Sequence, residues 1–146
     1  MPLPAFTEFG DLPPGVYEAG LREVIGRFGT GSNRRKLLAL RLARVHGIAS
    51  RTGHLFRFVV FGSFVTSKSE PNDVDVFMVM GDGFEFGHLV GEARLLFEHA
   101  SAQHHFGCSV FWIRRLAAMG GEQAVIEDWQ IKRDGAERGI VEIIGA

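Results

Sequence analysis

Apolar side chains follow helix-like and strand-like spacings in turn along this chain, and the two spacings predict its elements. Residues 1–15 are rich in proline and glycine and should form an extended arm. The elements expected after it are helices over 16–28 and 33–50, strands over 55–61 and 73–80, a helix over 87–103, a strand over 108–114, a helix over 116–129 and a strand over 139–145. This order indicates one α/β (α+β) domain over 1–146, a small mixed β-sheet with helices packed on one side of it.

The helix expected over 33–50 carries the clearest local signals. Ser32 or Asn33 can cap its first turn, because either side chain can accept a hydrogen bond from a free backbone N–H. The helix should bury one stripe of apolar residues at helical spacing, formed by Leu38, Leu42, Val45 and Ala49. In the helix over 116–129, Gly120 and Gly121 should cause an early break.

The composition is that of an ordinary folded domain, with 46% apolar and 23% charged residues. No apolar run approaches the roughly 18 residues that a membrane span needs, so no membrane association is expected. The first residues do not show a basic segment followed by an apolar one, and no signal peptide is predicted. Cys108 is the single cysteine, which fits a cytoplasmic location. We expect it to be a small buried hydrophobe rather than a reactive thiol.

Charge is unevenly distributed along the chain, although the net charge is only −1. Ten Lys or Arg and one acid lie between Arg22 and Lys68, whereas six basic and thirteen acidic residues follow from Ser69 onward. Such asymmetry is typical of a surface that meets phosphates. The alternative is a solvated helix face that acids from the other half balance in space.

Two aspartates interrupt the apolar strand expected over 73–80. Asp73 and Asp75 are one residue apart, so their side chains point to the same face of a sheet. Like charges this close repel one another unless a cation lies between them, and paired carboxylates are usual ligands of Mg²⁺. Gly62 and Ser63 end the preceding strand and can offer backbone N–H groups and a hydroxyl to an anion. A phosphate cradle beside a carboxylate pair suits nucleotidyl transfer; the alternative is a turn followed by surface aspartates.

The spacing of Gly62-Ser63 and Asp73-x-Asp75 resembles the signature of the DNA polymerase beta-like nucleotidyltransferase superfamily. The segments FTEFGDLPPGVYEAGLREVIGRF, GSNRRKLL and GSFVTSKSEPNDVDV, with the ending RDGAERGIVEI, are similar to a bacterial family of small stand-alone nucleotidyltransferase-like proteins. The resemblance implies a minimal nucleotidyltransferase fold, phosphate binding by Gly62 and Ser63, and Mg²⁺ binding by the catalytic pair Asp73 and Asp75. It also implies that Lys68 neutralises a phosphate of the bound NTP, unless it is a plain surface lysine.

One position departs from the superfamily pattern. A third carboxylate normally comes from a later strand, and Ser109 stands at about that place. One hypothesis is therefore an enzyme that moves a nucleoside monophosphate from an NTP to a hydroxyl on RNA, such as tRNA, or on a protein. A second is a degenerate module that binds a nucleotide or a partner, and a third is a structural subunit with a vestigial site. The resemblance also implies a cognate toxin or antitoxin protein as partner, or a phage-defence pair.

Overall fold

The fold is built on a five-stranded mixed sheet, which the computed structural model describes together with the rest of residues 3–145. The strand order is β1-β5-β2-β3-β4. The strands are β1 (Val16–Ala19), β2 (Leu55–Phe61), β3 (Val74–Met80), β4 (Cys108–Arg114) and β5 (Ile140–Ile143). β1 pairs in parallel with β5 and β3 with β4, whereas β2 is antiparallel to both of its neighbours. The mixed sheet predicted from the sequence is thus confirmed.

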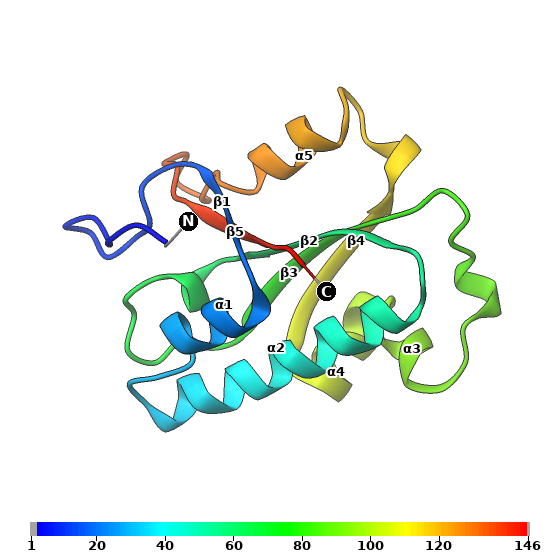
Figure 1. The fold of residues 1–146 in the computed structure, drawn as a ribbon, viewed down its shortest axis with the longest axis horizontal. Coiled ribbons are helices and arrows are strands. Elements are labelled where there is room, and N and C mark those ends of the chain that lie inside the picture. Colours follow the sequence, from blue (N-terminus) through cyan, green and yellow to red (C-terminus); the bar gives the residue numbers. More distant parts are fainter. Residues whose placement is uncertain (1–2, 146) are drawn as a thin grey trace.

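Helices cover both faces of this sheet (Figure 1). The larger layer contains α1 (Leu21–Phe28), α2 (Asn33–Arg51), α3 (Gly91–Leu96) and α4 (His99–Phe106), and α5 (Glu122–Asp128) lies alone on the other face. The prediction that the helices lie on one side is therefore wrong for α5. Ile126 of α5 packs with Val59 of β2 and Phe77 of β3 in a second, smaller core. A sheet apolar on both faces needs cover on both.

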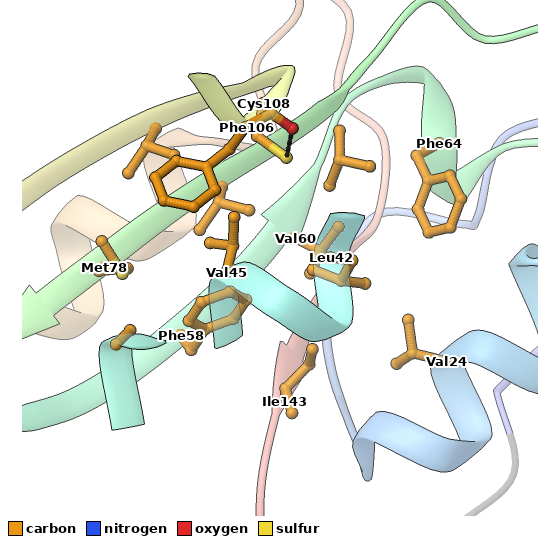
Figure 2. Close-up of a cluster of buried hydrophobic side chains, with 14 of the residues drawn as sticks. Val24, Leu42, Val45, Phe58, Val60, Phe64, Met78, Phe106, Cys108 and Ile143 are labelled. Carbon is orange, nitrogen blue, oxygen red and sulfur yellow. Dashed lines mark hydrogen bonds between the residues drawn. The ribbon is translucent and has the colours of Figure 1, made fainter. Parts of the chain in front are cut away.

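The sequence of α2 explains both its start and its place in the main core. Ser32 caps the helix, because its side chain accepts a hydrogen bond of 3.1 Å from the backbone N–H three residues on. Figure 2 shows Leu42 and Val45 of α2 in the same cluster as Phe58 and Val60 of β2. All four residues of the predicted apolar stripe are buried, namely Leu38, Leu42, Val45 and Ala49.

Three predicted helices differ from the observed ones. Val16–Ala19 is an edge strand instead of a first helical turn, because parallel pairing with β5 overrides the local pattern. The helix expected over 87–103 is divided into α3 and α4, since Glu98 between them has an extended backbone. α5 begins only at Glu122, after the predicted break, where Gly120 and Gly121 both have positive φ. Within residues 3–145, none of the helices is long and apolar enough to cross a membrane.

The N-terminal arm packs along its own domain, and it is extended only in part. A turn interrupts it, in which the N–H of Thr7 donates a hydrogen bond of 2.7 Å to the carbonyl of Asp11. Leu12 is buried, and its carbonyl accepts a hydrogen bond of 2.8 Å from the backbone N–H of Gly139. Nearer the start, the guanidinium of Arg27 lies 4.5 Å from the ring centre of Phe6. The first two residues of the predicted arm lie outside the described part of the chain. The arm therefore contacts both α1 and the segment that leads into β5.

Cys108 of β4 lies in the main core, on the face of the sheet that the larger helix layer covers (Figure 2). Its thiol donates a weak hydrogen bond of 3.7 Å to the carbonyl of Phe106. Burial raises the pKa of the thiol to about 12, so the reactive thiolate is strongly disfavoured at neutral pH. The prediction of a buried hydrophobe is confirmed.

Candidate functional site

The two aspartates meet at the start of β3, on the face that α5 partly covers. Asp75 is the second residue of the strand, and Asp73 precedes the strand directly. Side chains alternate along a strand, so both share a face with Phe77 of the smaller core. Ser109 of β4 is paired with Asp75, and its hydroxyl donates a hydrogen bond of 2.9 Å to Oδ2 of Asp73. Two carboxylates and one hydroxyl therefore form one polar group.

The carboxylate pair retains a proton near neutral pH. Burial raises the pKa of Asp75 from the ordinary 3.8 of an aspartate to about 7, and the charge of Asp73 and a hydrogen bond to it act in the same direction. Ser109 and the positive charge of Arg138 act in the opposite direction but are smaller influences. A divalent cation would compete with this proton, because its ligands must be deprotonated. The oxygen-rich donor set fits Mg²⁺.

Gly62 brings the backbone at the end of β2 against Asp75. Its φ of +80° and ψ of −165° belong to a region that essentially only glycine adopts. A Cβ at this position would collide with the Asp75 carboxylate, at 2.9 Å from its Cγ atom. Ser63 then opens a short 3-10 helix (Ser63–Val65), and its carbonyl accepts a hydrogen bond of 2.7 Å from the Thr66 hydroxyl. The Gly-Ser step thus lies where the sequence pattern predicts it, beside the carboxylates.

Arg35 holds the loop that follows Gly62. Its side chain is only 6% exposed, and its guanidinium donates five hydrogen bonds of 2.5–3.0 Å. The acceptors are the backbone carbonyls of Phe28, Phe64, Thr66 and Lys68. Burial lowers the pKa of Arg35. Of the two alternatives for the basic half of the chain, a phosphate-facing surface and a solvated helix face, neither applies to Arg35, because its donors are used inside the protein.

A cavity of about 750 Å³ opens beside the carboxylate pair. Gly62, Asp75 and Ser109 contribute to its lining, and His99 and Gln103 of α4 border it. Cavities of roughly 300–1,000 Å³ are typical of small-molecule sites. The predicted site residues outside this lining are Ser63, Lys68 and Asp73. Lys68 is exposed and is not part of this lining.

One wall of the cavity is aromatic. Phe61 ends β2, Phe111 lies in β4 and Trp129 follows α5 directly. The ring centre of Trp129 lies 4.5 Å from that of Phe61 and 5.2 Å from that of Phe111. These rings offer flat apolar faces to a ligand with a planar group. Their strands and helix are far apart in the sequence, and no spacing pattern could have grouped them.

The lining of the cavity also contains cations that sequence reasoning missed. They are Lys132, Arg133 and Arg138, all from the predominantly acidic second half of the chain. Of the basic residues between Arg22 and Lys68, none lines the cavity in the described chain. The alternative of charges balanced in space holds for Arg57, which forms two hydrogen bonds of 2.8 and 2.5 Å to the Glu142 carboxylate.

The third carboxylate of the superfamily pattern has no counterpart beside the pair. Across residues 3–145, His, Cys, Asp and Glu nowhere form a group of three or more that could hold a metal ion. Asp73 and Asp75 supply two carboxylates, and Ser109 supplies a hydroxyl. Mg²⁺ commonly uses one or two carboxylates and completes its shell with water and substrate phosphates. The site thus suits one such ion together with a phosphorylated ligand.

Comparison with known proteins identifies the family. Residues 4–144 match the model of a family of unknown function (DUF6932), and the chain belongs to this family. No curated protein matches the chain, and no solved structure does.

Proposed function

We propose that this member of DUF6932 is a Mg²⁺-dependent nucleotidyltransferase, which moves a nucleoside monophosphate from an NTP to a hydroxyl on RNA or protein. The observation that supports it best is that Gly62 and Asp75 line one large cavity, while Asp73 is held beside them by its hydrogen bond to Ser109. A pair of partly buried carboxylates is unfavourable without a cation. A bound metal ion would offset the repulsion between the two carboxylates, and a phosphorylated ligand in the cavity would supply further oxygen ligands to it.

The proposed roles follow from the contacts. Asp73 and Asp75 would hold the ion through their carboxylate oxygens, and Ser109 orients Asp73 by its hydrogen bond of 2.9 Å. Gly62 lacks a side chain where the backbone passes the carboxylate, which lets the end of β2 approach Asp75 closely. When bound, Mg²⁺ neutralises the phosphates and stabilises the leaving pyrophosphate. The acceptor oxygen forms a bond to the α-phosphorus, the bond to pyrophosphate breaks, and the hydroxyl proton is released.

A second candidate function is nucleotide binding without transfer. Ser109 favours it, because a hydroxyl is a poor base for the acceptor proton at neutral pH, whereas a carboxylate can serve. The two candidates share the Mg²⁺–NTP site and differ only in the chemical step. They are therefore separated by a transfer assay and not by a binding assay.

The binding test is thermal melting with each of the four common NTPs, with and without Mg²⁺. A ligand that binds only the folded protein raises the midpoint as its concentration increases. We expect a Mg²⁺-dependent rise for at least one NTP, and the loss of that rise in Asp75→Asn. Asp128→Asn is the matched control, since Asp128 is exposed at the end of α5. The absence of any shift with every NTP would refute both candidates.

The transfer test uses the NTP identified by melting, labelled at its α-phosphate, with RNA and protein fractions of a cell lysate. Label that becomes attached to RNA or protein with wild type, and not with Asp75→Asn, supports the enzyme. Binding without attached label, in lysates that contain both acceptors, supports the second candidate.

A further inference from the structure

The segment that follows α5 forms a short hairpin along one wall of the cavity. Its two arms are joined by the bridge between Ile131 and Glu137 and by a hydrogen bond of 2.8 Å from the N–H of Lys132 to the carbonyl of Ala136. The N–H of Arg138 also donates to the carbonyl of Gln130 at 3.0 Å. The hairpin therefore has a defined backbone that can hold side chains ready for a ligand.

The hairpin leads into β5 beside the Gly-Ser step. β2 and β5 are paired through Val59 with Glu142 and Val60 with Val141. Continued by two residues, this register places Gly139 across from Gly62, with Arg138 next to it. β3, which carries Asp75, lies on the other side of β2. The end of β2 thus runs between a carboxylate on one side and a guanidinium on the other.

The lining of the cavity contains three cations, all from the hairpin, and two acids. Lys132, Arg133 and Arg138 are the cations, and Asp75 and Asp134 are the acids. Asp11 of the N-terminal arm is the nearest counter-ion, but it lies 3.5 Å from Arg138 and 4.0 Å from Lys132. Both distances exceed the usual 2.7–3.2 Å of an N–H···O hydrogen bond, so the cations keep donors for an anion. Arg133 is exposed at the tip.

We propose that this hairpin is the binding site for the phosphate tail of the nucleotide, with Lys132, Arg133 and Arg138 contacting the phosphates beyond the α-phosphate. This inference rests on the proposed function. It predicts that the site binds nucleoside di- and triphosphates more tightly than monophosphates. Guanidinium groups bind phosphate oxygens through two parallel hydrogen bonds, and a lysine adds a mobile point charge. The rings of Phe61, Phe111 and Trp129 in the same cavity remain available for the planar base.

The experiment compares the affinities of an NTP and of the monophosphate with the same base, in Mg²⁺, by the fluorescence of Trp129. Trp112→Phe in the background removes the other tryptophan, which is packed away from the cavity against Phe84 and Phe97. In the double variant Lys132→Gln/Arg133→Gln, the Kd of the triphosphate should rise roughly tenfold or more, whereas the Kd of the monophosphate should change little. Asp11→Asn should tighten triphosphate binding roughly two- to fivefold, because it removes a competing anion.

The matched control is Arg22→Gln/Lys36→Gln, which removes one arginine and one lysine exposed on α1 and α2, across the sheet from the cavity. It should leave both affinities unchanged. A hairpin variant that melts like wild type and keeps its preference for the triphosphate would overturn the inference and leave the proposed function intact. If wild type binds neither ligand, the proposed function fails, and the inference fails with it.

Discussion

Arg35 offers the sharpest test of how this protein holds its Gly-Ser loop. Replacement by methionine keeps most of the apolar length of the side chain and removes every donor. Three of the four acceptor carbonyls, those of Phe28, Phe64 and Thr66, are buried, so water cannot readily replace the guanidinium there. At about 1 kcal/mol or slightly more for each buried acceptor left without a partner, Arg35→Met should lower the free energy of unfolding by about 3 to 4 kcal/mol.

Lysine at the same position separates charge from geometry. An ammonium group keeps the charge but cannot reach acceptors on both sides of the loop as the planar guanidinium does. We expect Arg35→Lys to lose about 2 kcal/mol, between methionine and wild type. The control is Arg34→Met, because Arg34 is exposed and makes one long hydrogen bond of 3.5 Å to Asn72. Its loss should stay within about 0.5 kcal/mol.

Urea denaturation of the four proteins, fitted with a common slope, measures these differences. A loss of 3 to 4 kcal/mol is a large fraction of the roughly 5–15 kcal/mol by which a domain is stable. The reasoning is refuted if Arg35→Met is no less stable than Arg34→Met, or if Arg35→Lys matches wild type. The second result would mean that the buried charge matters and the fork of hydrogen bonds does not.

Two further predictions concern residues of the cavity. Without metal (in EDTA), folded Asp75 holds its proton up to about pH 7 and the unfolded chain releases it near the ordinary 3.8, so the stability of wild type should fall as pH rises between these values. From pH 5 to 8 it should fall by about 2 kcal/mol more than that of Asp75→Asn, with allowance for partial exposure; equal slopes in urea titrations would contradict this. Gly62→Ala should cost about 2 to 4 kcal/mol and abolish Mg²⁺–NTP binding, because strain and the collision with Asp75 add together. Gly53→Ala, with a similar φ of +77° and open space around it, should cost less in the same denaturation assay, and equal losses would show that the collision is absent.

The parts of the fold that could be predicted are those with local signals. α2 has a cap at Ser32 and a regular apolar stripe, and both are found where the sequence places them. β1 could not be predicted in the same way, because its four residues are separated from an amphipathic helix by Gly20 alone. Only its pairing with β5, at the far end of the chain, makes it a strand.

The candidate site also has a part that local sequence signals predict and a part that they do not. Gly62 directly follows β2 and Asp75 lies in β3, its antiparallel neighbour in the sheet, so the sequence pattern brings them together correctly. Apart from Phe61, which directly precedes Gly62, the aromatic and cationic walls arise from segments more distant in the chain, and no short motif links those segments to the Gly-Ser step. The burial of Arg35 could not be predicted for a related reason. A sequence shows the charge of an arginine, but it does not show that a loop thirty residues later surrounds it.

The position of β5 between β1 and β2 has a consequence for synthesis on the ribosome. β2, β3 and β4 can associate as soon as they emerge, because they are consecutive in the chain. β1 is made first, yet its partner within the sheet is β5, which is made after all the others. β1 therefore remains without its partner strand in the sheet until β5 has been translated. The hairpin before β5 also emerges late, so a nascent chain would acquire the cationic wall of its cavity only when its sheet can close.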